Sequence, residues 1–139
     1  MGVLIAHKKI SDLWGKATHA TTFGGNPLVT AAGWAAVKIV REEGLLANVR
    51  KQSRILFKEL SLLQKKYPFV RDVRGKGLMI GMELDRPGTP VVQAAMKRGL
   101  LINCTQERIL RLYPALTVRQ QEINQAVGML DAALGCVAP

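Results

Sequence analysis

Residues 70–84 read VRDVRGKGLMIGMEL, and the fold class follows from this stretch. Two strand-like runs, residues 70–74 and 78–84, flank the triplet Gly75-Lys76-Gly77, and this pattern is typical of a β-hairpin. A lone hairpin is only marginally stable in water, so further strands or helices have to pack against it. The stretch therefore predicts a small antiparallel sheet with a second layer of structure.

The rest of the chain predicts two more short strands and four helices. Asn26-Pro27 begins the first helix as N-cap and first-turn residue, and Thr89 is expected to cap the third. Thr117, with Gln120 three residues later, is expected to cap the last helix in a capping box. The sequence thus predicts an α+β fold, a small, mostly antiparallel sheet packed against helices. The expected strands are residues 100–104 and 108–113, and the expected helices are residues 28–43, 45–66, 89–99 and 117–134.

The N-terminal part of the chain is less regular. Residues 2–6, GVLIA, are a candidate for a short buried strand. Residues 17–37 carry no Lys, Arg, Asp or Glu and are long enough to span a bilayer. Only the second half of this stretch is continuously apolar, so we expect a buried helix with a polar lead-in and no membrane span.

Composition excludes several classes of protein. The chain has 139 residues, of which 48% are hydrophobic and 22% charged, so it is neither disordered nor too short to build a core. Cys104 and Cys136 form no CxxC pair, which argues against a zinc ribbon, an iron–sulfur site or a disulfide scaffold and favours a reducing, cytoplasmic setting. His7 and His19 lack neighbours at metal-ligand spacing, so no metal is expected.

The formal net charge of +10 raises the question of a nucleic-acid partner. Much of the basic excess lies on the expected helical surface of residues 50–66. We interpret it as a solvated helix face, or one that meets an acidic partner, because no nucleic-acid-binding motif accompanies it.

Two stretches carry candidate site residues. In residues 21–27, TTFGGNP, two hydroxyls precede two glycines and a strongly capped helix, a combination that suits either a phosphate or a simple capped turn. In residues 109–114, ILRLYP, Arg111 stands between apolar neighbours of a short strand. Its planar guanidinium fits a carboxylate, which belongs either to a substrate or to an acidic residue such as Glu83 or Glu122.

Five segments resemble, in the same order, motifs of the class III, pyridoxal-phosphate-dependent aminotransferases. Residues 21–28, TTFGGNPL, resemble the (S/T)-T-(F/Y)-G-G-N-P-L motif, and residues 42–49, EEGLLANV, resemble the E-E-x-L-x-x-N-V segment. Residues 67–81 resemble the V-R-G-x-G-L-M-x-G hairpin, and residues 99–103 and 109–114 resemble the closing strands. The resemblance covers nearly the whole chain.

The resemblance implies the C-terminal domain of fold-type I pyridoxal-phosphate-dependent transferases. Family members are much longer, and their Schiff-base lysine lies upstream of the segment matched here, so we expect a fragment that has no catalytic residue and no activity alone. The implied organisation is the end of the large domain with the phosphate-contacting loop in residues 1–25, a helical connector of two helices in residues 26–66, and a small α+β domain in residues 67–139.

The resemblance also implies roles for the candidate residues. Thr21 and Thr22 match the hydroxyl pair that reaches across a homodimer to the phosphate of pyridoxal 5'-phosphate in the other subunit. Arg111 matches the arginine that receives a substrate carboxylate, although Ala115 stands where the family usually has a second proline. The implied substrates are small-molecule amino and keto acids: acetylornithine or a related ω-amino donor, with 2-oxoglutarate as acceptor, in arginine biosynthesis and amino-acid metabolism.

Two other classes of function stay open at this point. One is a free-standing, non-enzymatic module that binds a partner. The other is a basic nucleic-acid-binding domain, which would show a steep salt dependence of DNA binding.

Overall fold

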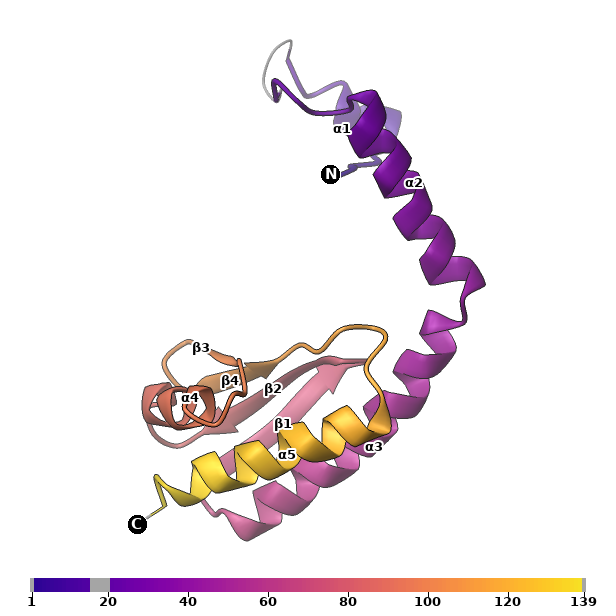
Figure 1. The fold of residues 1–139 in the computed structure, drawn as a ribbon. Helices are drawn as coiled ribbons and strands as arrows, with labels where there is room; N and C mark the ends of the chain where they lie inside the picture. The colour runs from indigo at the N-terminus through magenta and orange to yellow at the C-terminus, as the bar shows by residue number, and fades with distance from the viewer. Residues whose placement is uncertain (1, 16–20, 139) are drawn as a thin grey trace. The chain divides into compact units, whose positions relative to one another are not determined.

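The computed structural model describes residues 2–15 and 21–138, and the chain divides into two compact units, Met1–Glu43 and Gly44–Pro139 (Figure 1). Every buried side chain of the described residues belongs to the second unit. Residues 16–20, which include His19 and most of the expected polar lead-in, lie outside the described residues.

The second unit is an α+β layer, which confirms the fold class expected from the sequence. Its sheet has the strand order β1-β2-β4-β3, and all neighbouring strands are antiparallel. The elements are α3 (Leu45–Lys66), β1 (Val70–Lys76), β2 (Met79–Leu84), α4 (Thr89–Met96), β3 (Asn103–Thr105), β4 (Ile109–Leu112) and α5 (Gln120–Gly135).

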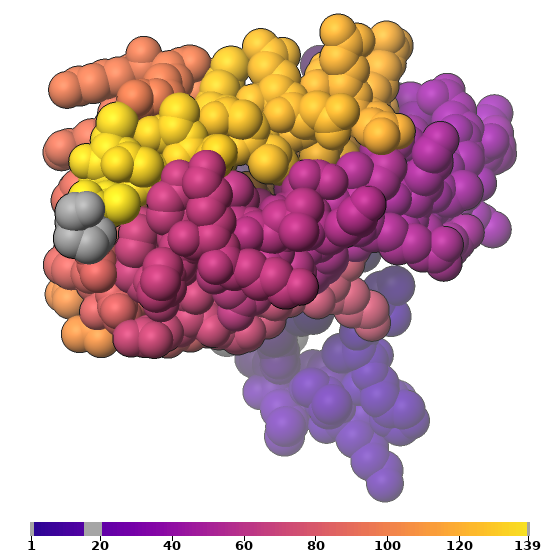
Figure 2. Space-filling view, turned by 90° about the horizontal axis from the view of Figure 1, so that it is seen from below, coloured from indigo at the N-terminus to yellow at the C-terminus, as the bar shows by residue number. Residues whose placement is uncertain are grey.

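One face of the sheet is covered by helices. Helices α3 and α5 run side by side along that face, and α4 packs against α5 (Figures 1 and 2). The core between the two layers is continuous from α3 through the strands to α5. Its largest fully buried side chains are Leu60, Met82, Leu84, Val91, Leu110, Ile123, Leu130 and Leu134.

The strand period of two determines which side chains reach this core. On β4, Leu110 and Leu112 are buried, whereas Arg111 between them is exposed. On β2, Met82 is likewise buried between Gly81 and Glu83, which are only half-buried. The face of the sheet opposite α3 and α5, here called the open face, therefore carries Gly81, Glu83 and Arg111.

The hairpin turn lies further along the chain than the sequence suggested. The expected turn triplet starts at Gly75, but β1 continues to Lys76, which pairs with Met79, so that Gly77 and Leu78 make the turn. Gly75 stays in the strand with a φ of +155°, and a Cβ there would lie 2.1 Å from the Met79 carbonyl oxygen. Glycine at position 75 permits this close backbone approach, and the turn itself needs the positive φ of Gly77.

The helix starts also differ in detail from the expected caps. Helix α4 begins at Thr89 itself, with Gly88 as its N-cap residue. Helix α5 begins at Gln120, so Thr117 does not cap it. The Arg119 N–H instead donates to the Glu122 Oε2 atom at 2.7 Å, because the Glu122 side chain folds back over the first turn.

The first unit contains α1 (Lys8–Ser11) and α2 (Pro27–Glu42). Residues 2–6 form no strand, and all are exposed, so the expected buried strand is wrong for this chain. Helix α2 is apolar as expected, but none of its residues is buried, and Leu28 and Trp34 are 80% and 71% exposed. The described residues of the first unit thus leave the apolar side chains of α2 uncovered.

Helix α3 belongs to the second unit, where it packs on β1 and α5. The two-unit division thus differs from the division into residues 1–25, 26–66 and 67–139, which stays a prediction for the complete enzyme. Within the described part of the chain, no helix combines the length and apolarity needed to cross a membrane.

Candidate functional site

The loop before α2 is shaped by its own hydrogen bonds. Asn26 caps the helix, since its Oδ1 atom accepts from the Val29 N–H at 3.0 Å and its Nδ2 atom donates to the Phe23 carbonyl oxygen at 2.6 Å. The Gly24 N–H donates to the Thr21 carbonyl oxygen at 3.3 Å. The cap expected at Asn26 is confirmed, and the loop is held in a defined turn.

This loop presents two threonine hydroxyls. Thr21 and Thr22 are exposed, and neither hydroxyl has a hydrogen-bond partner among the residues that the structure describes. A Cβ at Gly24 would lie 2.2 Å from the Thr21 Oγ1 atom, so glycine there leaves room for the hydroxyl in its present position. Two exposed hydroxyls beside a pair of glycines at the N-terminus of a 16-residue helix fit the donor set that a phosphate needs.

Arg111 lies in the middle of β4, where it pairs with Gly81 of β2 and Asn103 of β3. Its side chain belongs to the open face, because both neighbours on the strand are buried. Neither ion pair considered from the sequence forms, since Glu83 is bound by Arg74 and Glu122 accepts from the Arg119 N–H. Arg111 makes no ion pair with any described residue, and its guanidinium is available to a ligand.

Arg111 borders a hollow of about 540 Å³ on the open face. Arg74 and Arg111 both pair with Gly81, so a residue without a side chain separates two arginines in one cross-strand row. A Cβ at Gly81 would lie 3.1 Å from the Ile109 Cγ2 atom, closer than side chains usually pack. The hollow therefore has a backbone floor with cationic groups on either side.

The two arginines differ in their ion pairs, since Arg74 has acidic partners among the described residues and Arg111 has none. Arg74 contacts both Asp72, at 2.8 Å, and Glu83. The hydrogen bond to Asp72, followed by that to Glu83, raises the pKa of Arg74 above its usual value. Sequence reasoning missed this cluster, because the strand register that brings Asp72, Arg74 and Glu83 together is not visible from local patterns.

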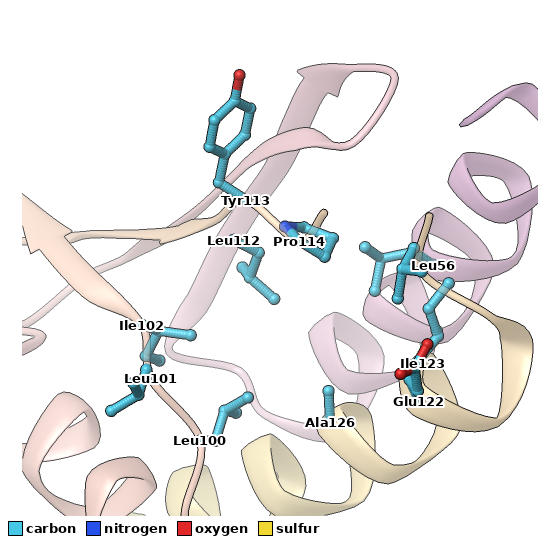
Figure 3. A pocket seen from close by; sticks show the side chains of 11 residues that line it. Leu56, Leu100, Leu101, Ile102, Leu112, Tyr113, Pro114, Glu122, Ile123 and Ala126 are labelled. Carbon is cyan, nitrogen blue, oxygen red and sulfur yellow. The ribbon is translucent and has the colours of Figure 1, made fainter. Parts of the chain in front are cut away.

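A second cavity, of about 220 Å³, lies on the helix side of the sheet (Figure 3). Leu112 and Ile123 help to form its apolar wall, and Glu122 adds a carboxylate. Tyr113 points away from the other labelled side chains, as the strand alternation requires (Figure 3). An apolar wall with a carboxylate does not suit an anionic substrate, so this cavity is a poor carboxylate site.

The candidate residues lie in different units. Thr21 and Thr22 belong to the first unit, and Arg111 belongs to the second. The structure describes the local geometry of each place by itself.

Comparison with known proteins supplies a family. The family model described as "Aminotransferase class-III" matches residues 1–134. The chain is 40% identical over 135 residues to the acetylornithine aminotransferase of Caldanaerobacter subterraneus subsp. tengcongensis, a match that covers 96% of this chain and 34% of that protein. The chain thus spans about a third of the length of the curated relatives that it matches.

Solved structures agree with this relation. The crystal structure of acetylornithine aminotransferase from Elizabethkingia anophelis matches with a TM-score of 0.79 and 29% identity, covering 94% of this chain and 35% of that one. An amine transaminase from an uncultivated Pseudomonas species, solved in its PLP-bound form, matches with a TM-score of 0.77 and 30% identity over 87% of this chain and 30% of that one.

Proposed function

Since the chain belongs to the class-III aminotransferase family, we propose that it is the C-terminal part of a pyridoxal-phosphate-dependent transaminase. The proposed amino donor is acetylornithine or a related ω-amino compound, and the proposed acceptor is 2-oxoglutarate. The similarity to acetylornithine aminotransferases supports the donor, and a role in arginine biosynthesis would follow from it.

The observation that carries this proposal is the exposed guanidinium of Arg111 on the open face, which forms no ion pair with a described residue. Amino and keto acids alternate as substrates in transamination, and both carry a carboxylate that has to be held in each half-reaction. A guanidinium serves both, because it stays charged and takes no part in proton transfer. The backbone floor at Gly81 leaves room for a carboxylate beside it.

Thr21 and Thr22 would hold the phosphate of the cofactor. When bound, pyridoxal phosphate supplies an electron sink for the negative charge that develops at the substrate carbon. The threonine hydroxyls would anchor the phosphate by donating hydrogen bonds while it stays charged. In this proposal the two threonines of one subunit serve the cofactor of the other, so the complete enzyme is a homodimer.

The family resemblance implies that the Schiff-base lysine lies upstream of the segment matched here, and this supports a second part of the proposal. We therefore propose that the chain alone has no transaminase activity. In this proposal, activity needs this chain joined to the remainder of the enzyme.

The test of the proposed function is Arg111→Lys in the complete enzyme. Lysine keeps the charge but loses the two-pronged guanidinium, so we expect a loss of roughly 1.5–3 kcal/mol, or about ten- to a hundredfold in kcat/KM, in both half-reactions. Arg108→Lys, an exposed change just before β4, is the matched control and should leave kcat/KM unchanged.

Thermal melting of the same two variants separates binding from folding. A purely structural Arg111 predicts a lower melting temperature with normal kcat/KM in the folded fraction, and that result would remove Arg111 from the substrate site.

A further inference from the structure

Glu83 occupies a symmetrical position on the open face. On one side of β2 it pairs with Asp72 of β1, and on the other side it pairs with Ile109 of β4. Gly81, two residues earlier on the same face, pairs with both Arg74 and Arg111. Glu83 is therefore the diagonal neighbour of both arginines, and long side chains reach each other across such diagonals.

In the structure, Glu83 pairs with Arg74 and not with Arg111. The Glu83 carboxylate binds Arg74, and Asp72 binds the same guanidinium at 2.8 Å. Asp72 and Glu83 lie directly opposite each other, an arrangement of like charges that costs free energy unless a cation lies between them. Arg74 provides this cation, so Glu83 is attracted toward β1 and away from Arg111.

We infer that Arg74 is a positioning residue, which holds Glu83 on the β1 side of the sheet and so keeps the Arg111 guanidinium unpaired for a substrate carboxylate. The inference rests on the proposed carboxylate-binding role of Arg111. Without Arg74, the Glu83 carboxylate turns to Arg111 and competes with the substrate for the same donors. Gly81 has no side chain that could separate the two.

The size of this competition is modest, because these side chains are partly exposed. Arg74 and Glu83 retain 49% and 40% of their side-chain exposure. An ion pair with this exposure changes the equilibrium constant of a process that makes or breaks it by about two- to fivefold. We expect loss of Arg74 to weaken carboxylate binding by that factor.

The experiment uses the 139-residue chain with 15N-labelled arginine, and NMR follows the Nε–Hε signal of Arg111. Arg74→Gln should move this signal, since Glu83 then pairs with Arg111. Arg74→Gln combined with Glu83→Gln should return the signal to its parent position, and Arg74→Lys should leave it there because the charge is kept. Arg71→Gln is the matched control, since it removes an exposed β1 arginine that pairs with Asp85 and not with Glu83.

An Arg111 signal that stays in place in Arg74→Gln overturns the inference. A shift that persists in the double variant also overturns it, because Glu83 is then not its cause. Circular dichroism melting shows that each variant is folded when its spectrum is recorded.

Titration with 2-oxoglutarate tests the proposed function separately. The parent chain should show a saturable shift of the Arg111 signal, weakened about two- to fivefold in Arg74→Gln and restored in the double variant. If the Arg111 signal of the parent chain does not shift when 2-oxoglutarate is added, the carboxylate-binding role of Arg111 is overturned. The comparison without ligand still decides whether Arg74 holds Glu83.

Discussion

The two units of this chain obtain their order from different sources. In Gly44–Pro139, side chains from three helices and three of the four strands interlock in one core. In Met1–Glu43, the described residues make local contacts such as the Asn26 cap, and no described side chain is buried. A helix of 16 residues is only marginally stable by itself in water. The contrast teaches that the proposed carboxylate site has a rigid support, whereas the proposed phosphate loop depends on what packs against α2.

Hydrogen exchange in the 139-residue chain should give the largest contrast between the units. We expect amides of α3 to open only with global unfolding, and amides of α2 to exchange almost freely. For a domain stability of about 5 kcal/mol, protection in the two helices would differ by roughly 10³- to 10⁴-fold. Equal protection of the two helices would contradict this contrast and show that α2 packs against a partner. Repeating the measurement at several protein concentrations would show whether that partner is a second copy of the chain.

A matched pair of leucine truncations gives the next effect. Leu60→Ala removes a fully buried side chain of α3 and should cost about 2–5 kcal/mol in the free energy of unfolding. Leu28→Ala removes an 80% exposed side chain of α2 and should change that free energy by less than about 0.5 kcal/mol. Urea denaturation measures both, and similar losses would mean that α2 packs in solution.

Thr22→Ala tests the phosphate loop in the complete enzyme. One lost hydrogen bond to a charged phosphate should weaken cofactor binding by about 1.5–3 kcal/mol if the loop is buried there. The cofactor dissociation constant provides the measurement. Thr117→Ala is the control, because this exposed threonine before α5 makes no side-chain hydrogen bond to a described residue. Unchanged cofactor binding in Thr22→Ala would leave Thr22 as a turn residue.

The smallest effect concerns an ion pair of the second unit. Asp131 binds Lys66 at 2.8 Å, and this hydrogen bond lowers the pKa of Asp131 from its ordinary value of 3.8, with a further contribution from the Tyr67 hydroxyl. A carboxyl group whose pKa is lower in the folded state stabilises the protein above pH 3.8, and this stabilisation is lost as the pH falls through the folded-state value.

Asp131→Asn should therefore cost up to about 1 kcal/mol at pH 7, because the pair is partly exposed, and the difference should shrink toward pH 3. Asp12→Asn in α1, whose pair with Lys8 is far more exposed, is the control and should have no measurable effect. Melting curves at pH 7 and pH 3 give the comparison, and an Asp131→Asn loss that does not shrink at low pH would contradict it.

Local chemistry explains how far the sequence could predict this fold. Asn26-Pro27 marked the start of α2 because a cap and a first-turn proline act within four residues. The cap predicted at Thr117 was wrong, although threonine is a common N-cap residue. The Glu122 side chain, which is part of α5, accepts the hydrogen bond of the Arg119 N–H at the start of the helix. Gly75 misled because a strand residue with a positive φ resembles a turn residue in sequence.

The site was predictable only in part. Alternation along β4 implies that Arg111 and its buried neighbours face opposite sides. The ion-pair partner of Glu83 was not predictable, because it depends on β2 lying between β1 and β4. Residues 74 and 111 are far apart in sequence, and no local pattern shows that both flank Gly81.

The strand order has a last consequence, for aggregation. The outer strands β1 and β3 leave backbone donors and acceptors that another chain could pair with, and such edges are the usual start of intermolecular β-structure. Strand β1 carries Arg71, Arg74 and Lys76 and has an irregular register between Val70 and Asp72, while β3 has only three residues. Positive charge, a bulge and shortness all oppose the addition of a strand from another copy at either edge of the sheet.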